Sequence, residues 1–91
     1  MIVIEDAYRE TLALLARRAG GATICPSEVA RALAAEVGDK PVAMDWRDAM
    51  PVVHAAIDQL VREGAVQLSW KGEVLNARVG PYRIRRTHGR E

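Results

Sequence analysis

Two stretches in the first half of the chain repeat apolar residues at the spacing of an amphipathic helix. From about Glu5 to Ala19 the apolar positions advance in steps of three and four, and Gly20-Gly21 supplies a stop. A second helix is expected from Pro26, which suits the first helical position, to about Val37. Residues 22–24 can form only a small strand, and the segment from Gly38 to Met44 is predicted to be a loop.

A third helical pattern follows and is interrupted by a proline. Asp45 is a good N-cap, and from Trp46 onward apolar residues again recur at steps of three and four. Pro51 falls inside this run, where it lacks a backbone donor and clashes with the preceding turn. We therefore expect a short helix over residues 45–50 and a longer one starting near Pro51, with one continuous, kinked helix as the alternative.

After the third helix the apolar period changes from 3.6 to 2. Residues 66–70 alternate apolar and polar side chains, which predicts a half-buried strand. Lys71-Gly72 fits a two-residue turn, and residues 73–78 would form the returning strand of a hairpin. Beyond a break at Gly80-Pro81, residues 82–85 are expected to add a last extended piece.

The order helix, short strand, helix, helix, hairpin is that of a winged helix, an α+β fold. Three helices would form its core, and the hairpin, or wing, would pair with the strand at residues 23–24 in a small antiparallel sheet. Another small α+β domain with the same element order is the alternative. We expect one domain over residues 1–86 and a flexible C-terminal tail over residues 87–91.

Short motifs spread from about residue 10 to residue 86 carry a family resemblance. They are Thr23-Ile24-Cys25-Pro26-Ser27-Glu28-Val29-Ala30, Asp45-Trp46-Arg47 with Met50-Pro51, Lys71-Gly72, and Gly80-Pro81 with Arg83. In these motifs the chain resembles a small bacterial family of uncharacterised winged-helix proteins. The resemblance implies the winged-helix fold and brings no activity with it.

Composition limits the class of protein. Of the 91 residues 49% are apolar but none is Phe, so most of the large side chains for packing are expected to be Trp46, Trp70, Tyr8 and Tyr82. The single cysteine excludes an internal disulfide and points to a reducing compartment. The acidic start of the chain does not resemble a signal peptide, and no apolar run approaches the ~20 residues of a membrane span. We therefore expect a cytoplasmic protein without membrane contact.

The charge is unevenly divided along the chain and favours nucleic-acid binding. Residues 1–64 carry seven basic and ten acidic groups, a net charge of −3, whereas residues 65–91 carry six basic and two acidic groups, a net charge of +4. Asp48 and Asp58 on the third helix would repel phosphates, so the wing and tail should contribute most to weak, sequence-independent DNA binding. The predicted nucleic-acid contacts are Gln59, Arg62, Lys71, Arg83, Arg85 and Arg86.

The alternative function is that of a protein-binding adaptor without DNA binding. Exposed Trp46, Trp70 or Tyr82 would then anchor the partner, and the complex would be insensitive to Arg85→Glu. A homodimer is also considered, through residues 2–4, the first helix or an edge of the sheet.

Catalysis and cofactor binding are not expected. Cys25, at the start of a helix, and His54 are the best candidates for a nucleophile and its base, but a lone cysteine among apolar neighbours is more often a core residue. Cys25, His54 and His88 lack the paired spacing of metal ligands, and the chain has no glycine motif that would hold phosphates. We therefore predict a binding protein that has no metal and no cofactor.

Overall fold

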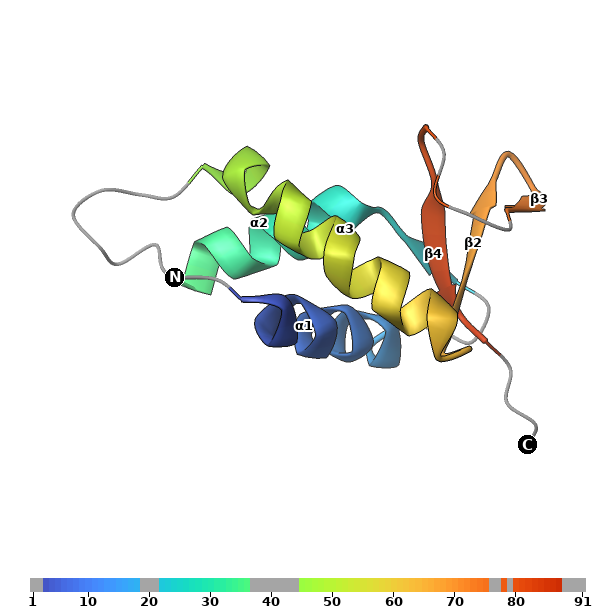
Figure 1. The fold of residues 1–91 in the computed structure, drawn as a ribbon, viewed down its shortest axis with the longest axis horizontal. Coiled ribbons are helices and arrows are strands. Elements are labelled where there is room, and N and C mark those ends of the chain that lie inside the picture. Colours follow the sequence, from blue (N-terminus) through green and yellow to red (C-terminus); the bar gives the residue numbers. More distant parts are fainter. Residues whose placement is uncertain (1–2, 19–21, 37–44, 76–77, 79, 88–91) are drawn as a thin grey trace.

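The computed structural model describes residues 3–18, 22–36, 45–75, 78 and 80–87. Within them, the sheet stands at one end of the three helices (Figure 1). This is the predicted α+β class in a winged-helix-like arrangement. In chain order the elements are α1 (Ile4–Ala16), β1 (Thr23–Ile24), α2 (Pro26–Glu36), α3 (Trp46–Arg62), β2 (Val66–Trp70), β3 (Glu73–Leu75) and β4 (Arg83–Arg86).

The sheet is antiparallel and has the strand order β1-β4-β2-β3. The predicted pairing of the hairpin with β1 is wrong, because β4 lies between β1 and β2. Ile84 at the centre of this strand stands opposite both Ile24 of β1 and Leu68 of β2. Because Tyr82 and Ile84 are buried, β4 completes the apolar face of the sheet and is not an appendage to it.

The turn between β2 and β3 is the predicted two-residue turn. Lys71 and Gly72 both have positive φ, 53° and 86°, as a type I′ turn requires, and Trp70 stands opposite Glu73. Lys71 is a non-glycine residue in this conformation, and the twist of the hairpin favours it there. Residues 76–77 of the predicted returning strand lie outside the described residues, as do the predicted loop over 38–44 and residues 88–91 of the predicted tail.

α3 is one continuous helix, so the prediction of two separate helices is wrong and the continuous alternative is confirmed. Asp45 caps it as predicted, because its carboxylate accepts a hydrogen bond from the backbone N–H of Arg47 at 3.0 Å. Pro51 lies within the helix on its exposed side. Apolar residues on both sides of Pro51, such as Ala49 and Val53, are buried in the same core, and this packing outweighs the missing backbone hydrogen bond.

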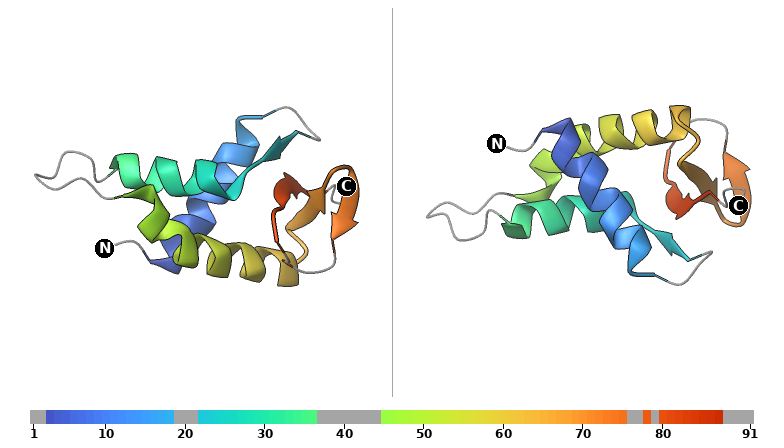
Figure 2. Two further views of the ribbon diagram at one scale, coloured as in Figure 1. Left: turned by 90° about the horizontal axis from the view of Figure 1, so that it is seen from above. Right: turned by 90° about the horizontal axis from the view of Figure 1, so that it is seen from below.

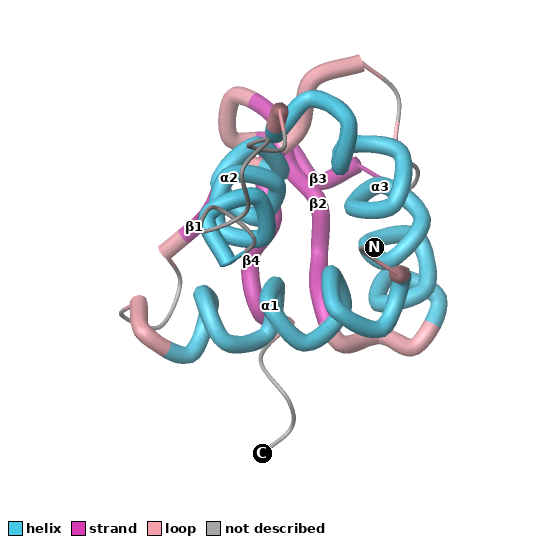
Figure 3. The backbone as a smooth tube through the Cα atoms, turned by 90° about the vertical axis from the view of Figure 1, so that its left-hand side faces the viewer, coloured by secondary structure: helices cyan, strands magenta, loops and turns pink. Residues whose placement is uncertain are grey.

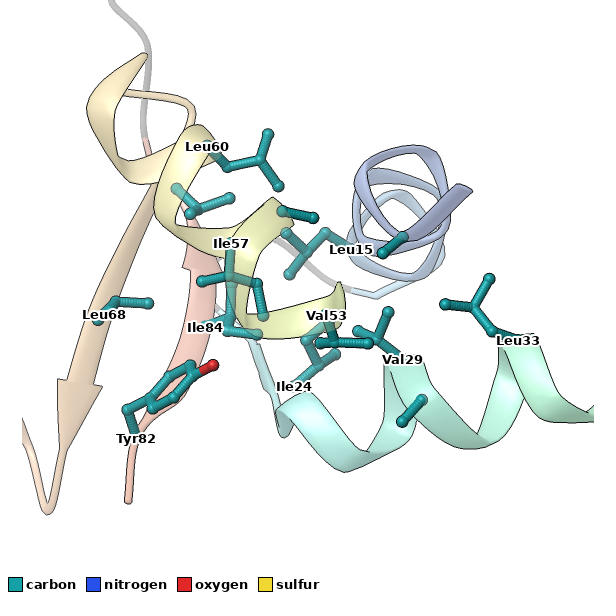
Figure 4. Packing of buried hydrophobic residues seen from close by; sticks show 14 of the residues in the cluster. Leu15, Ile24, Val29, Leu33, Val53, Ile57, Leu60, Leu68, Tyr82 and Ile84 are labelled. Atoms are coloured by element: carbon teal, nitrogen blue, oxygen red, sulfur yellow. The ribbon is translucent and has the colours of Figure 1, made fainter. Parts of the chain in front are cut away.

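The core fills the space between the three helices and the inner face of the sheet. α1 crosses α2 and α3 (Figure 2), and together the helices frame this face (Figure 3). Figure 4 shows Ile57 of α3 and Ile84 of β4 pointing toward one another. Thr11 of α1 is buried among these apolar groups, and its hydroxyl donates to the Ala7 carbonyl at 2.7 Å. The core residues are Ala7, Leu15, Ile24, Val29, Ala30, Leu33, Ala49, Val53, Ala56, Ile57, Leu60, Val66, Leu68, Tyr82 and Ile84.

The aromatic residues are not all core residues, in contrast to the expectation from composition. Tyr82 is buried, Tyr8 and Trp46 pack partly against the core, and Trp70 is 38% exposed. Trp70 is the last residue of β2, next to the turn, where the helices no longer cover the sheet. Among the described residues, no helix is both long enough and apolar enough to cross a membrane.

Candidate nucleic-acid interface

The outer face of the sheet carries a row of polar and basic side chains. Successive residues of a strand point to opposite faces, so the burial of Ile84 directs its neighbours Arg83 and Arg85 outward. The same alternation in β2 leaves Gln67 and Ser69 outside while Leu68 is buried. The outer face opposite the helices is therefore built by the period-2 pattern of β2 and β4.

Hydrogen bonds hold two arginines of β4, Arg83 and Arg85, against this face. The Arg83 guanidinium donates from Nε to the Thr23 hydroxyl at 2.6 Å and from Nη2 to the Thr23 carbonyl at 3.2 Å. Arg85 Nη2 donates to Gln67 Oε1 at 2.9 Å. Because these acceptors are neutral, the bonds orient the guanidinium groups without neutralising them.

Lys71 joins the two arginines around a shallow cavity of about 420 Å³, which we call the basic pocket. It lies over the outer face of the sheet and extends to the turn between β2 and β3. None of the described residues that line it is acidic. The lining residues are Thr23, Gln67, Ser69, Lys71, Gly72, Val74, Arg83 and Arg85.

The charge of Arg83 in the basic pocket contributes to lowering the pKa of Glu28, a carboxylate near the start of α2. Glu28 accepts hydrogen bonds from the Cys25 N–H at 2.9 Å and from Arg18 at 2.6 Å. Partial burial opposes its ionisation, but these two bonds and the charges of Arg18 and Arg83 hold the Glu28 pKa below its usual value. Glu28 thus caps the start of α2.

The predicted contacts on α3 do not join the basic pocket. Gln59 lines a separate cavity of about 290 Å³ with Tyr8 and other residues of α1, and its amide donates to Glu63 at 3.2 Å. The Tyr8 hydroxyl also donates to Glu63, and this bond raises the pKa of Tyr8 and lowers that of Glu63. Arg62 is exposed in the last turn of α3. Arg86, at the end of β4, is exposed but does not line the basic pocket.

Arg78, another cation of the basic C-terminal third, is paired with an acid of α3. Its Nε and Nη2 donate to the two carboxylate oxygens of Asp58, both at 3.0 Å. This bidentate bond lowers the pKa of Asp58 and raises that of Arg78. The pair largely cancels its own charge, so it adds little to the attraction of an anion.

A further cavity, which sequence reasoning missed, opens between the start of α2, the middle of α3 and the turn end of the sheet. We call it the aromatic pocket; its volume is about 350 Å³. The signal in the sequence was the chain's two tryptophans, which were assigned to the core but both line this cavity. The lining residues are Cys25, Pro26, Ser27, Trp46, Met50, His54, Trp70, Gly80, Pro81 and Tyr82.

His54 and Tyr82 form the polar part of the aromatic pocket. His54 Nδ1 and the Tyr82 hydroxyl are 2.6 Å apart. Burial lowers the pKa of His54, and the nearby positive charge of Arg78 lowers it further, so the imidazole is neutral at pH 7. Burial also raises the pKa of Tyr82, which keeps its phenol protonated. Cys25 lines the same pocket, and its sulfur accepts a long hydrogen bond from the Ser27 hydroxyl at 3.6 Å.

Two guanidinium groups lie against Trp46, one of the residues that line the aromatic pocket. The guanidinium groups of Arg31 and Arg47 each lie 4.6 Å from the ring centroid of Trp46. Arg47 and Trp46 are neighbours in the first turn of α3. The described part of the chain contains no group of three His, Cys, Asp or Glu side chains that could hold a metal ion.

Comparison with known proteins places the chain in a family. Residues 5–87 match the family described as "Protein of unknown function (DUF3253)", and the chain belongs to this family. A search among curated proteins finds no match. The motifs at Thr23, Asp45 and Gly80 that carried the resemblance all contribute residues to the aromatic pocket.

Proposed function

We propose that the protein binds the phosphate backbone of nucleic acid through the outer face of its sheet. The observation that carries this proposal is the basic pocket, in which Lys71, Arg83 and Arg85 stand together without a lining carboxylate among the described residues. Guanidinium and ammonium groups on one open surface are the usual means by which proteins bind phosphates. Contacts of this kind position a nucleic acid without reading its sequence.

The role of α3 in this proposal is that of a support for the sheet. A recognition helix contacts base edges through donors that point into the major groove. On α3, Gln59 bonds Glu63 beside α1, Asp58 is engaged by Arg78, and Arg62 is exposed but does not line the basic pocket. The proposed interface therefore consists of Lys71, Arg83 and Arg85, with Arg86 at its margin.

The direct test is binding to a mixed-sequence DNA duplex, followed by fluorescence anisotropy at 50 and 200 mM salt. If three phosphates are neutralised, the affinity should fall about fortyfold over this fourfold range of salt. The reason is that the logarithm of the binding constant falls by about 0.9 per phosphate contact for each tenfold rise in salt concentration. Absence of binding at 50 mM salt, or binding that does not weaken at 200 mM, contradicts the proposal.

Matched variants locate the interface. The double variant Lys71→Glu with Arg85→Glu should weaken duplex binding at least tenfold, since charge-assisted bonds contribute about 1.5–3 kcal/mol each. The control, Arg9→Glu with Arg62→Glu, makes the same change in net charge outside the basic pocket and should retain most of the affinity. An equal loss in both variants would show a general effect of net charge and no defined interface.

A second candidate function is strand pairing with a protein partner, which the position of β3 favours. β3 is the outermost strand next to β2, and its Val74 side chain is 57% exposed. An edge strand offers unpaired backbone groups to another strand. A second copy of the chain is the simplest partner, so this function predicts a dimer in sedimentation experiments that Val74→Pro abolishes and Arg85→Glu does not.

A further inference from the structure

The aromatic pocket and the basic pocket meet at the turn between β2 and β3. Trp70 lines the aromatic pocket, and Lys71, the next residue, lines the basic pocket. The ammonium group of Lys71 lies 6.0 Å from the centroid of the Trp70 ring, so a cation of the basic pocket stands beside an aromatic ring of the aromatic pocket. A ligand that occupies both pockets would present an anionic group to one and an apolar or aromatic group to the other.

The aromatic pocket has the chemistry of a site for a planar, polar ring. Its volume of about 350 Å³ lies within the range of small-ligand sites. Trp70 supplies an exposed aromatic face, and Met50 and Pro81 supply apolar walls. Since His54 Nδ1 is bonded to Tyr82, the other ring nitrogen, Nε2, is left for a ligand. A neutral imidazole nitrogen can hydrogen-bond the edge of a nucleobase.

The charges around the aromatic pocket match a ring that carries phosphates on either side. Arg31 and Arg47 each lie 4.6 Å from the Trp46 ring centroid, and Lys71 lies 6.0 Å from that of Trp70, so each tryptophan of the pocket has a cation beside it. Trp46 is half-buried and has two guanidinium groups against it, whereas Trp70 is 38% exposed and has one more distant ammonium group, so Trp70 offers the better stacking surface. A peptide side chain would have no need of cations on both sides, whereas the nucleotide unit of a single strand has a phosphate at each end.

We propose that the aromatic pocket receives an unpaired nucleobase of a single-stranded nucleic acid whose phosphates lie on the basic pocket. This inference rests on the proposed function and adds a preference for unpaired over paired strands. The base stacks on Trp70 and its edge faces His54, while Lys71 contacts a phosphate next to it. Stacking on an aromatic side chain accepts any base, so no sequence preference follows.

The test uses the full chain and its own fluorescence, because both tryptophans line the aromatic pocket. A twelve-nucleotide oligothymidylate and a duplex of the same length are titrated at 50 mM salt. The single strand should quench the tryptophan emission and bind at least tenfold more tightly than the duplex. Trp70→Ala should weaken single-strand binding about tenfold and leave duplex binding unchanged. Ile4→Ala removes an exposed apolar side chain of α1 that lines neither the basic nor the aromatic pocket, so it is the matched control and should bind both as the wild type does.

The possible outcomes separate this inference from the proposed function. Salt-dependent binding of both polymers with equal affinity, unaffected by Trp70→Ala, overturns the base pocket and leaves the proposed function intact. Failure of both polymers to bind overturns both proposals. An oligothymidylate that binds without quenching the tryptophan emission likewise overturns the inference, because no base then stacks on Trp70. Since Trp70 is exposed, its variant should melt within a few degrees of the wild type, which circular dichroism checks.

Discussion

The outer face of the sheet and the outer face of α3 both carry arginines, but the surroundings of these arginines differ. On the sheet, Arg83 and Arg85 are held by the neutral acceptors Thr23 and Gln67, so their charges remain available. On α3, the carboxylate of Asp58 holds Arg78 by two bonds and compensates its charge. For the attraction of an anion, the number of cations on a face therefore matters less than the charge of the groups that accept their hydrogen bonds.

The difference has its origin in the two kinds of secondary structure. In a strand, every second residue is exposed, so the residues flanking the buried Ile84 form a uniform basic row. On a helix, exposed positions three and four residues apart mix on one surface, and Asp58 and Arg62 are such neighbours. The strand therefore concentrates one sign of charge, whereas the helix interleaves both.

The largest expected effect is a difference in the free energy of unfolding between substitutions on the inner and on the outer face of β4. Ile84→Ala removes a fully buried side chain at the centre of the sheet and should lower the free energy of unfolding by about 3 kcal/mol. Arg85→Ala, the next residue, should change it by less than about 1 kcal/mol, because its side chain is half-exposed on the outer face. Urea unfolding measures both values. A large loss for Arg85→Ala would mean that the basic row is structural.

A smaller effect, on duplex affinity, is expected when the surface of α3 loses the carboxylate that compensates an arginine and so resembles the outer face of the sheet. Asp58→Asn removes the carboxylate that holds Arg78 and should free this cation for phosphates. Duplex affinity at low salt should then rise about threefold, since one cation is released and one anion is lost. Stability should fall by about 0.5–1 kcal/mol, the range for a partly exposed ion pair. Unchanged affinity would show that Arg78 does not reach bound nucleic acid.

The smallest effect concerns His54, which lines the aromatic pocket and contacts Tyr82. Because burial and the charge of Arg78 lower its pKa in the folded protein, the unfolded chain takes up the proton first as the pH falls. The free energy of unfolding should therefore decrease as the pH falls below about 6.5, the usual pKa of histidine. Urea unfolding at pH 7.5 and 5.5 measures this decrease, which should be smaller in His54→Asn. A wild-type protein that is more stable at pH 5.5 contradicts the assigned direction.

The sequence predicts the helices and the turn well because their signals are local. The spacing of Val53, Ile57 and Leu60 indicates a helix wherever it packs, and Lys71-Gly72 supplies the positive φ values of the turn. The position of β4 between β1 and β2 is not local. It depends on a pairing between Thr23 and Arg85, which are far apart in the chain, and nothing in either segment specifies the partner.

The candidate site is predicted in part for the same reason. The alternation around Ile84 indicates that Arg83 and Arg85 share a face, and Lys71 at the turn of the neighbouring hairpin lies at the same surface. Gln59 was placed with them because helix position alone does not tell which side α1 covers. Trp70 was assigned to the core because composition gives the amount of aromatic surface and not its location.

The most direct test of the comparison is the salt dependence of DNA binding for one arginine from each face. Arg85→Gln and Arg62→Gln each remove one charge, the first on the sheet and the second on α3. The slope of the logarithm of the binding constant against the logarithm of salt concentration should become shallower by about 1 for Arg85→Gln. The slope for Arg62→Gln should equal that of the wild type. A shallower slope for Arg62→Gln with an unchanged slope for Arg85→Gln would place the phosphate contacts on α3 and contradict the account.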